Sequence, residues 1–141
     1  MKYNSDEILK ILPHRPPFVL VDAILDVEAG KKAIGLKNIS LSDPVFQGHF
    51  PGYHIYPGVL QLEIMAQVGA ICILENPEYA NKLIMFAGVK NAKFKRQVKP
   101  GDTLIVETEL MEMRTAIGTA KGTIRANDKI VAMANIMFAI K

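Results

Sequence analysis

The chain has 141 residues, half of them hydrophobic and 22% charged, and this composition excludes an intrinsically disordered protein. A chain of this length buries roughly 70% of the surface that it exposes when unfolded, so we expect residues 1–141 to form one domain with a substantial core. The formal net charge of +3 suggests mild attraction to an acidic partner, and it is too small and too scattered to indicate nucleic-acid binding.

Cysteine content and the N-terminal sequence favour a cytoplasmic protein. Cys72 is the single cysteine, so no intramolecular disulfide can form, which fits a reducing compartment. The first ten residues lack the apolar segment of a secretory signal. The apolar run 59–74 is shorter than the ~20 residues of a membrane span and contains Glu63, so we interpret it as a buried helix.

The first part of the chain is expected to contain one short helix and a hairpin. Asn4 and Glu7 have the spacing of a capping box, and the amphipathic pattern that follows them ends at three prolines. Residues 18–27 are rich in strand-forming types, and their aspartates indicate one wet edge. A turn leads into residues 32–39, which continue the hairpin, and residues 41–47 are interpreted as a loop.

Residues 48–74 are the segment around which the rest of the chain is expected to pack. Their sequence is GHFPGYHIYPGVLQLEIMAQVGAICIL, which begins as a loop stiffened by Pro51 and Pro57. From residue 58 it is predicted to form about five turns of helix that are apolar on nearly every side. A helix without a polar stripe must be enclosed, and here the enclosing material is the rest of the protein.

The second half of the chain is predicted to consist of strands. A continuous apolar strand at residues 83–89 is followed by an alternating segment at 91–98 and a strong turn at 99–102. Three further strands are predicted at residues 103–113, 116–126 and 130–140. The connections between the late strands are too short for parallel crossovers, so the sheet should be antiparallel. The expected fold class is therefore α+β, with a curved antiparallel sheet wrapped around one long helix.

Glu63 and Gln67 are polar residues of this apolar helix, and their spacing of four places them on one face. The helix dipole favours ionised Glu63 by only about 0.3–1 kcal/mol and fades beyond the first turn, whereas burial disfavours the charged form more strongly. We therefore expect a neutral carboxylic acid that can donate a proton. A glutamate paired with an arginine, or one that reaches a wet rim of the sheet, accounts for the sequence equally well.

His49 and the start of the helix add two further groups to the same segment. An imidazole titrates near neutrality, so a histidine in a stiffened loop suits acid–base chemistry. The N–H groups of Gly58, Val59 and Leu60 lie at the positive end of the helix dipole, where they can polarise a carbonyl. A base, a neutral acid and a carbonyl-polarising helix start together suit removal of a proton α to a carbonyl with protonation of a β-leaving group.

Other chemistries find little support. The chain has no GxSxG or Cys/His signature, His14 and His54 have no neighbours that indicate a function, and His49 with His54 lacks the third ligand of a catalytic zinc site. We therefore expect neither a metal nor another cofactor. A basic run on one predicted hairpin is interpreted as a solvated strand face or as a docking surface for an acidic carrier, and it comprises Lys90, Lys93, Lys95, Arg96 and Lys99.

Motifs spread over nearly the whole chain carry a family resemblance. They are ILPHR (11–15), FVLVD (18–22), GHFPGYHIYPGVLQLEIMAQ (48–67), FAGVKNAKFKRQVKPGD (86–102) and VAMANIMFAI (131–140). On these motifs the sequence resembles the β-hydroxyacyl-[acyl carrier protein] dehydratases of type II fatty acid synthesis, and the 48–67 motif is highly specific. The resemblance implies the hot-dog fold.

The resemblance also implies a role for five residues. His49 and Glu63 match the catalytic histidine and glutamate, and Gly58 matches the glycine whose backbone N–H binds the thioester carbonyl. The backbone carbonyl of Ile55 would orient the histidine, and Gln67 would support the acid. In such enzymes the histidine and the acid of one site come from different subunits. The implied assembly is a homodimer with a shared sheet, often three dimers in a hexamer, which acts on acyl chains carried by the phosphopantetheine arm of acyl carrier protein.

The expected reaction is reversible dehydration of a (3R)-3-hydroxyacyl thioester to the trans-2-enoyl thioester. Glutamate at position 63 favours a plain dehydratase, because the related dehydratase-isomerases typically carry aspartate there. Four alternatives stay open at this point. They are a dehydratase of a secondary pathway such as polyketide or aryl-polyene synthesis, a dehydratase-isomerase, a hot-dog acyl thioesterase and a non-catalytic acyl-binding domain.

Overall fold

The computed structural model describes all 141 residues. Two α-helices, α1 (Ser5–Ile11) and α2 (Gly58–Leu74), are accompanied by two short 3-10 helices, η1 (Pro44–Gln47) and η2 (Pro77–Tyr79). The six strands are β1 (Ala23–Glu28), β2 (Lys32–Asn38), β3 (Ile84–Phe94), β4 (Thr103–Met113), β5 (Ile117–Ala126) and β6 (Lys129–Ile140). No helix is long and apolar enough to cross a membrane.

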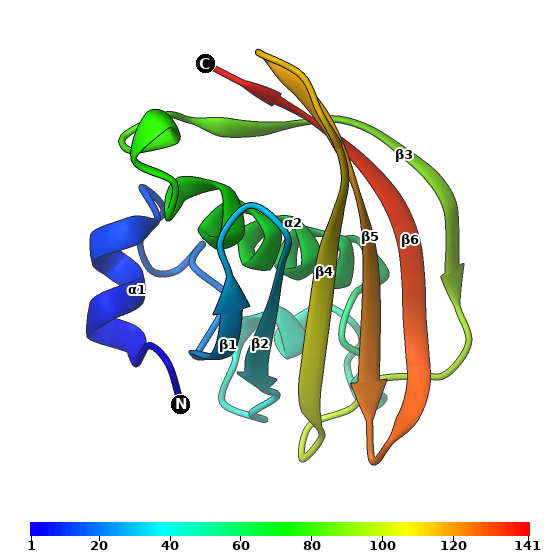
Figure 1. Cartoon of the computed structure of the whole chain (residues 1–141). Helices are drawn as coiled ribbons and strands as arrows, with labels where there is room; N and C mark the ends of the chain where they lie inside the picture. Colours follow the sequence, from blue (N-terminus) through cyan, green and yellow to red (C-terminus); the bar gives the residue numbers. More distant parts are fainter.

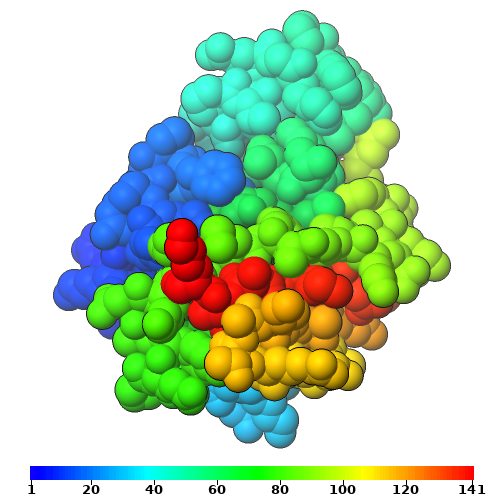
Figure 2. Space-filling model, turned by 90° about the horizontal axis from the view of Figure 1, so that it is seen from above, coloured from blue at the N-terminus to red at the C-terminus, as the bar shows by residue number.

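The six strands form one antiparallel sheet that curves around α2 (Figure 1). The strand order is β1-β2-β4-β5-β6-β3, so β3 crosses over to pair with the last strand and forms one edge of the sheet. In Figure 2 the edge is visible as successive bands of β3, β6 and β5, coloured green, red and orange. The predicted α+β architecture, with a curved antiparallel sheet around one helix, is confirmed.

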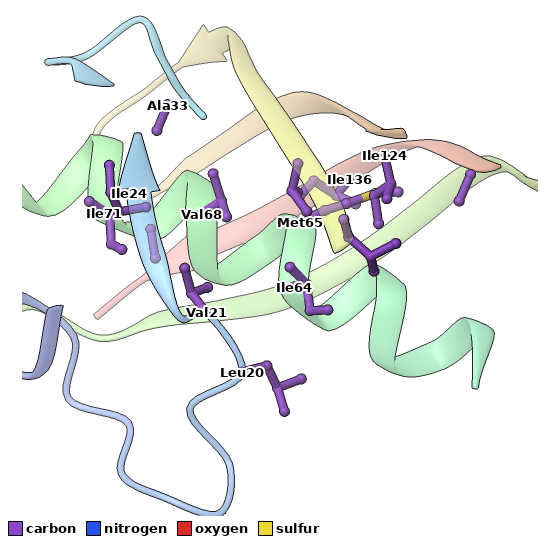
Figure 3. Packing of buried hydrophobic residues seen from close by; sticks show 14 of the residues in the cluster. Leu20, Val21, Ile24, Ala33, Ile64, Met65, Val68, Ile71, Ile124 and Ile136 are labelled. Atoms are coloured by element: carbon purple, nitrogen blue, oxygen red, sulfur yellow. The ribbon is translucent and has the colours of Figure 1, made fainter. Parts of the chain in front are cut away.

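The core lies between α2 and the concave face of the sheet (Figure 3). Met65 and Val68 of α2 point at glycines of the facing strands. A Cβ built on Gly122 would lie 2.4 Å from Met65 Sδ, and one on Gly35 would lie 2.6 Å from Val68 Cγ2. The absence of side chains at these two strand positions is what lets the helix lie so close to the sheet.

The N-terminal elements match the prediction in part. Asn4 caps α1 and forms the expected capping box with Glu7. Residues 18–22, predicted as strand, instead belong to a turn and a connecting segment, and β1 begins at Ala23. The reason is tertiary, because the N–H of Leu20 donates to the side chain of Gln67 rather than to a neighbouring strand. Residues 44–47, predicted as loop, form the 3-10 helix η1.

β3 differs most from its prediction. The segments predicted at 83–89 and 91–98 are joined in one strand that ends at Phe94, so residues 95–98 are not strand as predicted. The strand is interrupted by register shifts between Phe86 and Gly88 and between Lys90 and Lys93. Although the strand is largely apolar, its large apolar side chains are 42–49% exposed, namely Met85, Phe86, Val89 and Phe94. The apolar character of β3 therefore does not reflect burial within this chain.

The enclosure of α2 is also incomplete within one chain. Its C-terminal part is buried from Gln67 onward, as predicted. Near its start, however, Val59 is 72% exposed, and Leu60 and Leu62 are only partly covered. Both the start of α2 and the β3 edge thus leave apolar surface uncovered.

Candidate active site

His49 is held by the loop that leads into α2. Its Nδ1 lies 2.7 Å from the carbonyl oxygen of Ile55, and the N–H of Ile55 donates in return to the carbonyl of His49. A carbonyl can only accept a hydrogen bond, so Nδ1 carries the proton and the lone pair of the neutral ring lies on Nε2. The ring also stacks on Phe50, with centroids 4.1 Å apart. The loop therefore presents Nε2 of His49 as a proton acceptor.

The start of α2 offers two free backbone donors. Pro57 precedes the helix and supplies no side-chain cap, and the N–H groups of Gly58 and Val59 have no acceptor in the chain. The prediction that the N–H of Leu60 is free was wrong, because it donates to the carbonyl of Pro57 at 3.2 Å. The ring of Phe94 covers Gly58 so closely that a Cβ there would lie 3.0 Å from it. A larger residue at this position would therefore have to displace the ring by a few tenths of an ångström.

Glu63 and Gln67 are joined as their spacing predicted. The Gln67 amide is buried, and its Nε2 donates to Glu63 Oε2 at 2.9 Å and to the carbonyl of Phe18 at 2.9 Å. Its Oε1 accepts the N–H of Leu20 at 2.9 Å. Since that N–H can bond only to the amide oxygen, the orientation of the amide is fixed and Nε2 must face Glu63. No arginine of the chain forms an ion pair with Glu63.

Glu63 lines a cavity of about 250 Å³ whose walls are mostly apolar. The cavity lies between α2, the ends of β3 and β6, and the segment before β1, and its apolar lining includes Phe18, Ala66, Ile73, Ile84, Met85 and Phe138. Phe86, Ile136 and further residues complete it. Its titratable side chains are Glu63 and His14. A mostly apolar cavity that contains one carboxyl group suits an apolar ligand that reacts at a single polar group.

His14 is a residue of this site that sequence reasoning missed. Its Nε2 lies 3.9 Å from Glu63 Oε2, and its ring stacks on Phe18. No local pattern around His14 separates it from an ordinary loop histidine, because the contact depends on the folding of residues 14–20 against α2. His54, by contrast, packs edge-on against Phe46 and does not line the cavity.

The chain does not bring His49 and Glu63 into one cavity. The pocket around Glu63 excludes His49 and Gly58, whereas Gly58 and Ile55 line a separate hollow of about 340 Å³ beside Phe94 and residues 95–98. Residues 40–57, which carry His49, project as a lobe from the body in Figure 2 (cyan to blue-green). Each chain thus contains both groups, on different surfaces.

The basic run lies on β3 and on the connection to β4 rather than on a hairpin, so this detail of the prediction was wrong. Lys90, Lys93, Lys95 and Arg96 are exposed. Lys99 is only half-exposed, because its ammonium lies 3.9 Å from the centroid of the Tyr53 ring and donates to the carbonyl of His54. Four of the five basic residues are therefore free to meet a partner, while Lys99 contributes to local structure.

Cys72 is buried in α2, as expected for a small core residue. Burial raises the pKa of its thiol, and the sulfur donates to the carbonyl of Glu28 at 3.4 Å. A thiol held neutral in this way is a poor nucleophile. Nor does the chain gather three or more His, Cys, Asp or Glu side chains into a group suited to a metal ion.

Comparison with known proteins identifies the family. A model of the FabA-like domain matches residues 12–135. A 3-hydroxyacyl-[acyl-carrier-protein] dehydratase FabZ of Pelotomaculum thermopropionicum is 52% identical over 138 residues, covering 98% of this chain and 99% of the relative. The chain belongs to the β-hydroxyacyl-[acyl carrier protein] dehydratase family. The resemblance seen in its motifs is thus confirmed.

Further relatives agree with this assignment. The dehydratases FabZ of Caldicellulosiruptor bescii and Herpetosiphon aurantiacus are 49% and 52% identical, and the alignments cover 99% and 96% of this chain and of each relative. Among solved structures, the dehydratase heterocomplex ApeI:P from Xenorhabdus doucetiae matches with a TM-score of 0.80 over 94% of this chain and 89% of that one. At 19% identity this likeness supports the hot-dog fold of the dehydratase family and nothing finer.

Proposed function

We propose that the protein is a (3R)-3-hydroxyacyl-[acyl carrier protein] dehydratase of fatty acid synthesis, a hydro-lyase that removes water reversibly to give the trans-2-enoyl thioester. The observation that carries the proposal is Glu63, the one carboxyl group in an apolar cavity, which the fixed amide of Gln67 holds in place. The full-length similarity to proteins named as such dehydratases supports the same reaction.

In the proposed mechanism, His49 is the base and Glu63 the acid. Nε2 of His49, with its lone pair free, takes the proton from the carbon α to the thioester carbonyl. The free N–H of Gly58 binds the carbonyl oxygen as negative charge develops on it. Protonated Glu63 gives its proton to the hydroxyl on the β-carbon, the C–O bond breaks and water leaves. This scheme uses no metal and no redox cofactor.

A second copy of the chain would complete each site. The edge of β3 has 11 residues with no neighbouring strand on one side, and it carries exposed apolar side chains. Such an edge favours pairing with another strand, and a two-fold axis here would make one continuous sheet. The start of α2 would be covered at the same interface. The proposed homodimer brings His49 of one subunit to Glu63 of the other, and dimers can assemble further into a hexamer.

The substrate would reach this site on acyl carrier protein. The exposed residues Lys95 and Arg96 line the hollow at Gly58, and Lys90 and Lys93 extend the positive charge along β3. Lys99 donates to the carbonyl of His54 and so holds the neighbouring loop. Attraction to an acidic carrier would mainly speed encounter and would weaken with added salt. The fatty arm would then lie in the apolar cavity beside Glu63.

Replacement of Glu63 by glutamine tests the proposal. Glu63→Gln preserves shape but removes the acid, so we expect hydration of enoyl-carrier substrates to fall by about 10²–10⁴-fold, the usual contribution of a general acid. The assay follows loss of the conjugated thioester absorbance on short and long acyl chains. Glu75→Gln is the matched control, because Glu75 lies at the end of the same helix, bonds to the hydroxyl of Tyr3 and does not line the cavity.

Two outcomes would contradict the proposal. Near-normal turnover by Glu63→Gln would remove Glu63 from the mechanism. Release of free thiol by the wild-type protein, without any change in enoyl absorbance, would instead favour a thioesterase.

A further inference from the structure

His14 makes one contact that neither packing nor the proposed mechanism explains. Its Nε2 points towards Glu63 Oε2 across 3.9 Å, while its Nδ1 is buried and has no hydrogen-bond partner in the chain. The ring is held by stacking on Phe18, whose carbonyl accepts from Gln67. Gln67 and His14 thus approach Glu63 from two elements, α2 and the segment before β1.

The environment of His14 decides which of its nitrogens carries the proton. Both the tautomer protonated on Nδ1 and the charged ring would place an N–H on the buried Nδ1, where the chain offers no acceptor, and an N–H group buried without an acceptor is rare in proteins. The favoured form is therefore the neutral ring with its proton on Nε2. That N–H then faces Glu63 Oε2.

The two oxygens of Glu63 consequently differ. Oε2 already accepts the N–H of Gln67 at 2.9 Å and faces the N–H of His14, whereas no residue of the chain hydrogen-bonds Oε1. An oxygen that accepts from a fixed donor such as the Gln67 amide is the carbonyl oxygen of a carboxylic acid, so the transferable proton belongs on Oε1.

We propose that His14 is a positioning residue that assists the acid by directing its Nε2–H at Glu63 Oε2. This inference rests on the proposed dehydration. When Oε1 gives its proton to the departing hydroxyl, the β-carbon–oxygen bond breaks, water forms and Glu63 becomes a carboxylate. The gap of 3.9 Å is too long for a direct hydrogen bond to the neutral acid, and it can close, directly or through one water, as charge develops on Oε2.

The gain from His14 is therefore larger in the transition state than in the bound substrate. A hydrogen bond to a charged group contributes roughly 1.5–3 kcal/mol, which corresponds to about 10- to 150-fold in rate. Loss of this bond should lower kcat and leave KM within about two-fold, because the interaction forms only as the proton is transferred.

Three variants of His14 separate positioning from packing. His14→Phe keeps the stacking on Phe18 and removes the N–H, so kcat should fall by about 10- to 150-fold without loss of thermal stability. His14→Gln places an amide N–H where Nε2 was and should restore most of kcat. His14→Asn places the amide N–H near the position of Nδ1 instead, so it should not restore kcat. His54→Gln is the control for loss of a histidine outside the cavity.

A tautomer measurement completes the test on the unmodified protein. Nitrogen-15 chemical shifts of His14 should report a proton on Nε2 and none on Nδ1. A proton on Nδ1, an unchanged kcat in His14→Phe, or equal kcat in His14→Gln and His14→Asn would each overturn the role of His14. If the wild-type protein neither dehydrates nor hydrates acyl-carrier substrates, the proposed function is overturned instead. The nitrogen-15 measurement does not depend on activity, so it would still test which nitrogen of His14 carries the proton.

Discussion

Gln67 is the residue on which the geometry of the candidate site depends most. Its three hydrogen bonds join the acid on α2 to the backbone of Phe18 and Leu20. These two residues lie 49 and 47 positions before Gln67 in the sequence. The side chain is fully buried, so water cannot replace any of these partners. One amide therefore orients Glu63 and also holds the segment that carries His14 against the helix.

Substitution of Gln67 by leucine should destabilise the protein. Gln67→Leu leaves the buried N–H of Leu20 unpaired, at a cost of about 1–3 kcal/mol, and also removes the donor to the partly buried carbonyl of Phe18. We expect the free energy of unfolding, measured with denaturant, to fall by about 2–5 kcal/mol.

Gln61→Leu is the matched comparison for this measurement. Gln61 is also buried on α2, but its Oε1 has no partner and its Nε2 makes a single bond of 3.3 Å, to the carbonyl of Tyr56. Its loss should cost less than about 1.5 kcal/mol. Equal destabilisation by the two variants would show that the hydrogen bonds of Gln67 contribute no more to the free energy of unfolding than the single bond of Gln61.

At the scale of elements, the distance between α2 and the sheet is set by residues that lack side chains. Gly122 on β5 and Gly35 on β2 let Met65 and Val68 approach the strand backbones. Thr108 of β4 adds a direct link, because its hydroxyl donates to the carbonyl of Met65 at 2.7 Å. The helix is thus fixed in position along the sheet as well as buried by it, and Glu63 is placed two residues before this contact.

A methyl group added at Gly122 should destabilise the fold. In Gly122→Ala the new Cβ would lie 2.4 Å from Met65 Sδ and 2.9 Å from its Cβ, so both the side chain and the helix must shift. Overpacking of this kind costs about 1–3 kcal/mol, and the melting temperature should fall accordingly. Gly48→Ala is the control, because nothing lies within 4 Å of a Cβ there and its φ is negative. An equal effect at both glycines would contradict the close approach.

At the scale of the whole molecule, the exposed apolar surface and the divided site have one explanation. The β3 edge and the start of α2 are uncovered, and the cavity at Glu63 does not contain His49. A homodimer formed through β3 would cover the first two and supply the missing histidine. The proposed enzyme is therefore complete only as an assembly of two chains.

Mixing of two inactive variants tests this arrangement. His49→Ala removes the base and Glu63→Gln removes the acid, so each homodimer should be inactive. Mixed dimers contain one intact pair, and at random exchange about half of all dimers are mixed, so activity should recover to about a quarter of the wild-type value per chain. The assay requires a parallel measurement of subunit exchange with differently tagged chains. Continued inactivity despite exchange would contradict a site shared between subunits.

Local sequence patterns were sufficient to predict several elements. The capping box at Asn4, the bounds of α2 and the late antiparallel strands were each confirmed within about a residue. All depend on neighbours a few positions apart, through capping spacing, apolar content and turns. The specific motif at residues 48–67 also identified the family. Since an i,i+4 pair on a helix must share a face, the contact of Glu63 with Gln67 followed as well.

Tertiary structure alone decided the features that complete the site. The strand predicted at residues 18–22 is absent because Gln67 takes its hydrogen bonds, and that same contact brings His14 to Glu63. An apolar strand pattern does not say whether the chain itself or a partner covers it, and so the exposure of β3 was not predicted. The sequence predicted His49 and Glu63 as the acid–base pair by their types and motif, but their separate surfaces became evident only in the fold. Residue type determines the chemistry that is available, whereas long-range packing determines which groups meet.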